Sequence, residues 1–212
     1  TEKCVYKDGF DSFLRNTIQS GAAIVYAFTI KDHSMGSLFK QYDDRQFCNG
    51  HRTVTMGSPV AYLIRGKYSR EENLRMILEA RAEAGGNFLA GAAADENGEI
   101  TGEQLEERIA KTAANLDYAL DNKYAPPSNF FGVGGTKIFR DLIYQMRGFM
   151  KADHKFFKKN KMYDFPQKKV GSTLLMYLVG ALMASDKVQK KMGSKMSEGM
   201  LAPYKKVLDE EK

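Results

Sequence analysis

The sequence predicts an α/β fold, with a parallel sheet covered by helices on both faces and an α-helical extension at the C-terminal end. Over the first 127 residues, short unbroken runs of small, β-branched and aromatic residues alternate with segments of helical periodicity. Such alternation is typical of βαβ units. Beyond residue 136 the pattern changes to long Met- and Phe-rich helical segments. With 212 residues, of which 43% are hydrophobic, the chain is long enough to bury a substantial core.

The first predicted strand covers residues 22–29, AAIVYAFT, because this run is too continuously apolar for a strand with one solvated face. A helix is predicted just before it, since apolar residues recur at helical spacing between Phe10 and Ile18. Gly21 follows this segment at the position where helices commonly stop. The chain therefore enters the first strand from a helix.

Further elements repeat this alternation. Residues 59–64 and 88–93 are strand-like runs, and residues 71–84 between them form a helix with leucines and an isoleucine on one face. Residues 103–124 continue as a helix with apolar residues three and four apart, and two prolines then prevent its extension. Helices between buried strands require a parallel sheet.

We predict two parts, an α/β domain at residues 1–127 and a basic, Met-rich helical extension at residues 128–212. The Gly-rich segment 128–135 is the predicted hinge between them, because glycine tolerates unusual backbone angles. The formal charge of +6 is unevenly spread, with −3 on residues 1–135, +7 on 136–170 and +2 on the remainder. The basic character thus belongs to one segment.

The sequence also excludes several protein classes. Two cysteines, Cys4 and Cys48, are too few for a disulfide scaffold, and no apolar run approaches the ~20 residues that span a bilayer. We therefore expect a cytoplasmic protein without a transmembrane segment. The first residue is Thr1 rather than methionine, and we expect the chain to begin inside a longer gene product.

Candidate binding residues follow the first two strands, because ligands of open parallel sheets bind beyond the carboxyl ends of the strands. Residues 28–37 combine hydroxyl groups, a glycine and an aromatic ring, as a flat heteroaromatic ligand requires. Residues 65–70 add Tyr68, which offers a ring for stacking, and two cations, Arg65 and Lys67, for anionic groups.

The order of these segments resembles the NADPH-dependent FMN reductase group of flavodoxin-like proteins, including its iron–sulfur flavoprotein branch. AAIVYAFT is followed by SMGSLFK, by DDR and then by SPVAYLIRG, and the resemblance extends from Cys4 to about Asp164. Phe28 and Thr29 stand where the family has Ser and Pro, and Lys31 stands at the family's Tyr. The positions that match the family pattern are Ser34, Met35, Gly36, Lys40, Asp44 and Arg45.

The resemblance implies a flavodoxin-like fold that holds FMN and takes electrons from NAD(P)H or an iron–sulfur partner. The main chain after the first strand would hold the isoalloxazine ring, the loop after the second strand would close its other side, and no protein nucleophile is implied, so the catalytic residues stay unknown. The implied cofactor-binding residues are Phe28, Thr29, Ile30, Lys31, Asp32, Ser34, Met35, Gly66, Lys67 and Tyr68.

Two parts of the family pattern are missing. Nothing before Ala22 supplies the first strand or the phosphate-binding loop, so we expect a chain that lacks them or is completed by another polypeptide. Cys4 resembles the end of an iron–sulfur motif, but a cluster takes four thiolates and is expected only if further cysteines precede Cys4. No metal site is expected, because the cysteines and histidines are not at ligand spacing.

Two alternatives remain open at this stage. The chain is either an FMN-dependent oxidoreductase or a non-catalytic flavodoxin-like scaffold that has lost the cofactor and binds a partner. Lysines interleaved with aromatic residues at 151–169 suit RNA or an anionic membrane, but a solvated lysine face over packed rings is the more ordinary arrangement. We expect no nucleic acid partner. The apolar helix at 174–184 serves either core packing or subunit contact, and we expect a homo-oligomer or a partner redox subunit.

Overall fold

The computed structural model describes residues 6–164 and 166–185, together with isolated positions between 188 and 205. The chain divides into two compact units, Thr1–Phe139 and Arg140–Lys212, which are described separately below. The division falls inside helix α5 (Phe130–Gln145) rather than at residue 127, and the predicted hinge 128–135 is largely part of that helix.

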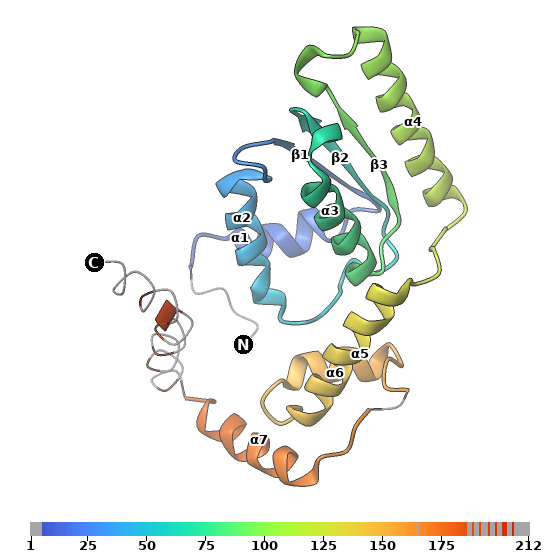
Figure 1. The fold of residues 1–212 in the computed structure, drawn as a ribbon. Coiled ribbons are helices and arrows are strands. Elements are labelled where there is room, and N and C mark those ends of the chain that lie inside the picture. The colour runs from blue at the N-terminus through green and yellow to red at the C-terminus, as the bar shows by residue number, and fades with distance from the viewer. Residues whose placement is uncertain are drawn as a thin grey trace. The chain divides into compact units, whose positions relative to one another are not determined.

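The first unit is built on a parallel sheet in the order β1-β2-β3 (Figure 1). The strands are β1 (Ile24–Thr29), β2 (Val60–Arg65) and β3 (Leu89–Ala94), each within one or two residues of its predicted run. Together with the helices between the strands, this sheet confirms the predicted α/β class, consistent with a flavodoxin-like fold followed by a helical extension.

Helices connect the strands. Helix α2 (Gly36–Arg45), between β1 and β2, is not among the predicted helices. Helix α3 (Glu72–Gly85), between β2 and β3, and α4 (Gly102–Asp121), after β3, match the helices predicted at 71–84 and 103–124. The segment before β1 is helical, as α1 (Phe10–Phe13) and the π-helical turn η1 (Leu14–Ile18). Short 3-10 turns complete the unit: η2 (Gln46–Asn49), η3 (Tyr68–Arg70) and η4 (Glu96–Gly98).

One face of the sheet carries the core of this unit. Tyr62 and Ile64 of β2 pack with Leu74 and Leu78 of α3, and all four side chains are buried. Tyr26 and its neighbours on the same face of β1 add partly buried rings. This cluster explains the apolar residues on this face of β2, while on the other face Ala61 is buried and Leu63 is partly exposed.

The opposite face is covered by α4 over β3 but is open over β1. The Asn115 amide of α4 donates a 2.7 Å hydrogen bond to the Ala90 carbonyl, and a side chain at Gly91 would collide with Thr112. On the same face, Val25 of β1 is 49% exposed and Leu63 of β2 is 39% exposed. The sheet therefore presents one apolar strand edge and part of one face to solvent.

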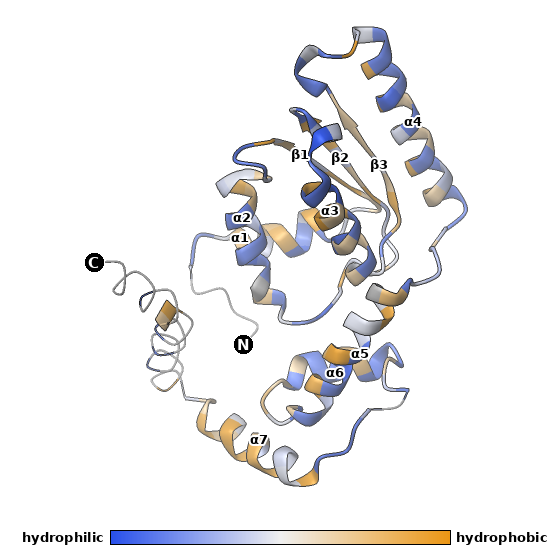
Figure 2. Ribbon diagram, viewed as in Figure 1, coloured by the Kyte–Doolittle hydropathy of each residue, from blue (hydrophilic) through white to orange (hydrophobic). Residues whose placement is uncertain are grey.

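The second unit contains the end of α5, α6 (Lys151–Lys159) and α7 (Val170–Leu182), and Figure 2 shows that α7 is apolar along its length. Arg140 is buried and pairs with Asp141 and Asp164. These contacts confirm a helical extension. The last of the helical segments predicted beyond residue 136, residues 198–208, lies mostly outside the described residues.

Candidate functional site

The loops after β1 and β2 meet at the carboxyl-terminal edge of the sheet, where the sequence places the candidate residues. The Ile30 amide donates a 2.9 Å hydrogen bond to the Arg65 carbonyl, which continues the pairing of the two strands. A Cβ atom at Gly66 would lie 2.9 Å from the Cβ atom of Ile30. The two loops therefore touch at Ile30 and Gly66.

A tight turn follows β1. The Lys31 amide donates to the Ser34 carbonyl at 3.0 Å, and the Ser34 amide donates back to Lys31 at 2.9 Å. The central residues, Asp32 and His33, both have positive φ, 48° and 58°, as a two-residue type I′ turn requires. The amides of Asp32 and His33 donate no hydrogen bond to another described residue.

Two contacts fix this turn. The Ser34 hydroxyl donates to the Lys31 carbonyl at 2.9 Å and accepts the Gly36 amide at 3.2 Å, which joins the turn to the start of α2. His33 Nδ1 lies 2.9 Å from a carboxylate oxygen of Glu71, the residue before α3. The turn is thus held from two helices, although the His33 ring is 86% exposed.

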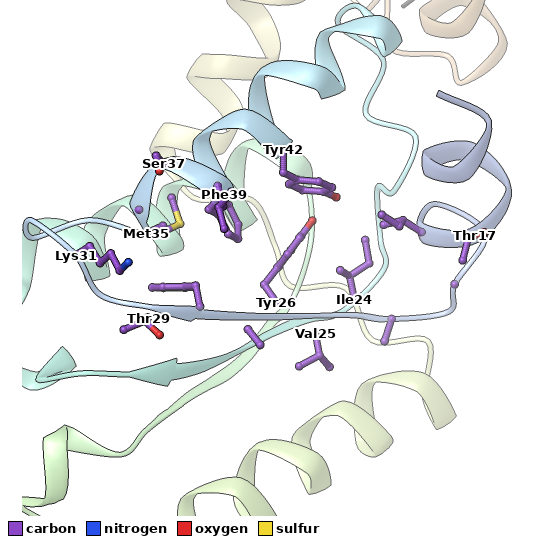
Figure 3. Close-up of a pocket in the computed structure, with 17 residues that line it drawn as sticks. Thr17, Ile24, Val25, Tyr26, Thr29, Lys31, Met35, Ser37, Phe39 and Tyr42 are labelled. Atoms are coloured by element: carbon purple, nitrogen blue, oxygen red, sulfur yellow. The ribbon is translucent and has the colours of Figure 1, made fainter. Parts of the chain in front are cut away.

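A cavity of about 710 Å³ runs along the free edge of β1 (Figure 3). Four of the predicted residues line its carboxyl-terminal half, Phe28 and Thr29 from β1 and Lys31 and Met35 from the turn. Its remaining wall comes from η1, from β1 and from α2. The lining residues that sequence reasoning did not select include Thr17, Ile18, Tyr26, Ser37, Leu38, Phe39 and Tyr42.

Aromatic rings form the α2 side of the cavity. The Tyr26 ring contacts Phe39 edge-on at a centroid separation of 5.4 Å and Tyr42 at 5.9 Å, and it stacks on Tyr62 at 5.5 Å. Burial raises the pKa of the Tyr42 hydroxyl, and its hydrogen bond with Tyr26 adds to the effect. Phe39 and Tyr42 stand three residues apart, a spacing that puts two side chains on one face of a helix, and this spacing is the signal that could have found them.

The remaining predicted residues do not line this cavity. Ile30, Asp32 and Ser34 build the turn beside it. The residues of the second loop are engaged elsewhere: Gly66 donates its amide to Asp95, Lys67 pairs with Glu99, and Tyr68 packs against the core cluster. The structure therefore brings four of the ten predicted residues together at the cavity, places three in the turn beside it and three in the second loop.

Acidic residues after β3 hold the second loop, and sequence reasoning missed them. Asp95 accepts the Gly66 amide at 2.8 Å and the Asn97 amide at 3.0 Å, and these bonds lower the pKa of its carboxyl. Glu96 is 4% exposed and accepts the amide and hydroxyl of Ser69 and a guanidinium hydrogen of Arg108. Asp95 and Glu96 come directly after a predicted buried strand, and this position indicates that they lie at the carboxyl-terminal edge of the sheet.

Other candidates have simpler surroundings. No group of three histidine, cysteine or acidic side chains lies together within the part of the chain that the structure describes. Cys48 is buried, and Cys4 lies outside the described residues. On α6, Phe157 is buried while Lys155, Lys158 and Lys159 are exposed, which is the arrangement of a solvated lysine face over packed rings.

No described helix combines the length and the apolar character that crossing a bilayer requires. Comparisons of the chain with protein-family models, with curated proteins and with solved structures find no match. The functional argument for this chain therefore rests on its sequence and on the geometry at the carboxyl-terminal end of β1.

Proposed function

We propose that the protein binds FMN at the β1 edge and acts as a flavin-dependent oxidoreductase or electron-transfer subunit. One observation carries the proposal: the cavity along β1 is lined at its carboxyl-terminal half by Phe28, Thr29, Lys31 and Met35, which the sequence singles out for a flavin. Ligands of open parallel sheets bind at this end of the strands.

The residues around the cavity fit an isoalloxazine ring. A volume of about 710 Å³ falls within the range of roughly 300–1,000 Å³ that small-molecule sites occupy. The wall is mainly aromatic and aliphatic, with hydroxyl groups at Thr29, Tyr26 and Tyr42. Such a wall takes the apolar body of a flat heteroaromatic ring and offers hydrogen bonds to its polar edge.

Each group in the wall has a limited chemical role. Met35 and Phe28 exclude water from the ring, and Thr29 supplies a hydroxyl beside it. Lys31 brings a positive charge to the rim, where it would attract the phosphate or an anionic form of the ring. Burial raises the pKa of the Tyr42 hydroxyl, so this group stays protonated near neutral pH and hydrogen-bonds rather than exchanging protons.

When bound, FMN supplies hydride and single-electron chemistry, and the chain supplies binding, orientation and charge. NAD(P)H or an iron–sulfur partner protein is the proposed electron source. Gly66, Lys67 and Tyr68 belong to this proposal as the neighbouring loop that borders the site beyond Ile30. A cytoplasmic protein acting as a homo-oligomer, or with a redox partner subunit, completes the proposal.

FMN titration of the purified chain, followed by flavin fluorescence and the visible absorption band, tests this function. We expect saturable binding. Lys31→Glu should weaken FMN about tenfold, which equals ~1.4 kcal/mol, and should affect riboflavin less because riboflavin has no phosphate. Thr29→Trp should weaken binding of both, because the indole would occupy the part of the cavity on the Val25 side of the β1 edge. Lys111→Glu is the matched control, since Lys111 is an exposed lysine of α4 away from the cavity.

Two outcomes decide against the proposal. A colourless chain that takes up neither FMN nor riboflavin favours the alternative, a non-catalytic flavodoxin-like scaffold that binds a partner. Binding that Thr29→Trp leaves unchanged removes the β1 cavity as the site. With FMN bound, anaerobic bleaching of the flavin band by NADPH supports the nicotinamide donor, and bleaching by dithionite alone points to a protein donor.

A further inference from the structure

Helix α7 presents an apolar stripe to solvent. Five of its aliphatic residues are between 55% and 71% exposed, and no charged or polar residue interrupts them. At about 100° per residue they span an arc of about 140°. The five are Val170, Leu174, Leu175, Leu178 and Leu182.

The inner face of α7 is more polar than this outer face. Thr173 is buried and accepts a 3.1 Å hydrogen bond from the Arg147 guanidinium. Gly180 packs on the main chain of Gly148, where any side chain would collide with the Gly148 carbonyl. The helix is therefore already docked through its Thr and Gly face, and the exposed leucines are not the surface that holds it in place.

The stripe is close to a palindrome about position 176. Residues at equal distances before and after position 176 are alike: Val170 corresponds to Leu182, and Leu174 corresponds to Leu178. Gly171 likewise corresponds to Ala181, and both are small exposed residues. Four of the five stripe residues thus face a branched residue, and small faces small, when two copies of the helix run antiparallel, while Leu175 lies opposite Tyr177. A two-fold interface needs this kind of self-complementarity.

The charges at the ends of α7 favour the same arrangement. Lys168 and Lys169 are exposed at the N-terminal end, where the helix dipole is positive and lysine is unfavourable. In an antiparallel pair about position 176, Lys169 lies opposite residue 183 of the second copy, the C-cap of that helix. Lysine is favourable there, because the helix dipole is negative at the C-terminal end.

We propose that α7 is a self-association surface, which pairs antiparallel with α7 of a second copy of this chain about a two-fold axis near residue 176. Leu174 of each copy packs against Leu178 of the other at the centre of the interface. This inference rests on the homo-oligomer of the proposed function but needs no flavin.

A lipid surface is the competing occupant, and the observations favour the second copy. Helices that lie on membranes carry basic residues along a polar face. The lysines of α7, Lys168 and Lys169, are at its N-terminal end, and no basic residue lies along the helix itself. The palindromic order has no role on a bilayer.

Sedimentation of the full chain at micromolar concentrations tests the interface. We expect a dimer for the natural sequence and a monomer for Leu174→Glu. The dimer dissociation constant should rise about a hundredfold or more, since one central residue is commonly worth a factor of ~30 and every dimer carries the substitution twice. Combining Leu174→Glu with Leu178→Lys should restore part of the dimer, because each Glu then faces a Lys of the second copy.

Ile138→Glu is the matched control, because Ile138 is 69% exposed on α5 and lies outside the stripe. It should leave the dimer intact, and circular dichroism should show unchanged helix content in all variants. A monomeric natural chain, or a dimer that survives Leu174→Glu, overturns the proposal. A monomer that pellets with phosphatidylglycerol vesicles through Leu174 assigns the stripe to lipid instead.

FMN titrations of the same samples keep the two proposals distinguishable. A dimer that binds no FMN leaves the α7 interface standing and removes the flavin function. A monomer that binds FMN overturns the α7 interface and leaves the flavin function standing.

Discussion

Gly66 sets the spacing between the two loops at the carboxyl-terminal edge of the sheet. It has a φ of +136°, and an added Cβ would meet the Ile30 side chain at 2.9 to 3.1 Å. Its amide is also committed to Asp95. Because the contact involves the Cβ atom of Ile30, which moves only with the backbone, the position leaves no room for a side chain.

We therefore expect Gly66→Ala to destabilise the protein by about 2–4 kcal/mol, from backbone strain and overpacking together. Gly98→Ala is the matched control. Gly98 also has positive φ, +81°, but open space surrounds it, so only the backbone cost of ~1–2 kcal/mol applies. Urea unfolding measures both changes, and equal losses for the two variants would show that the Ile30 contact contributes nothing.

Helix α6 shows how one element of the extension is held in place. Phe157 is buried, and His154 Nδ1 lies 2.9 Å from the Tyr163 hydroxyl beyond the end of the helix. Burial raises the pKa of Tyr163 to about 12, so its hydroxyl is protonated near neutral pH and shares a hydrogen bond with the His154 ring. Burial, followed by the charges of Arg147 and Lys158, holds the pKa of His154 below its usual value.

This histidine gives the extension a pH dependence of defined sign. Because the pKa of His154 is lower in the folded state, its contribution is complete above the unfolded pKa of about 6.5 and is lost as the pH falls toward the folded pKa. We expect the unfolding free energy to decline from about pH 7 to about pH 5 more steeply in the natural protein than in His154→Gln. Chemical unfolding of both proteins between pH 7 and pH 5 measures this difference. Equal declines of the unfolding free energy in the natural protein and in His154→Gln would contradict the prediction.

At the scale of the whole molecule, the open edge of β1 is the most exposed feature of the sheet. The strand IVYAFT carries no charge, proline or bulge, which are the devices that usually keep edge strands from pairing with other chains. Its outward face leaves Val25 49% exposed. The cavity proposed for the flavin runs along the same edge.

Val25→Lys should therefore reduce aggregation during refolding severalfold while changing the unfolding free energy by less than about 1 kcal/mol. Val133→Lys makes the same change on α5, where Val133 is 39% exposed and no strand edge is involved. Light scattering during dilution from urea compares the two. An equal benefit from Val133→Lys would attribute the effect to net charge instead of the β1 edge.

The sequence by itself determined the elements and their class, because hydrophobic periodicity is a property of chain neighbours. The predicted strands at 22–29, 59–64 and 88–93 all form, and their alternation with helices confirms the parallel α/β sheet. It also located the loop that supplies Lys31 and Met35 to the cavity, since the carboxyl ends of parallel strands share one edge.

Only the tertiary structure decided that the cavity lies beside β1 rather than beside β2 or β3 at the carboxyl-terminal end of the sheet. Strand order leaves β1 free on one side and puts β2 on the other, so Lys31 lines the cavity while Lys67 turns to Glu99. Tyr42 and Thr17 reach the cavity from helices on either side of β1 in sequence. These contacts join residues far apart in the chain, and no local pattern encodes them, because long-range packing alone determines which strand lies at the edge.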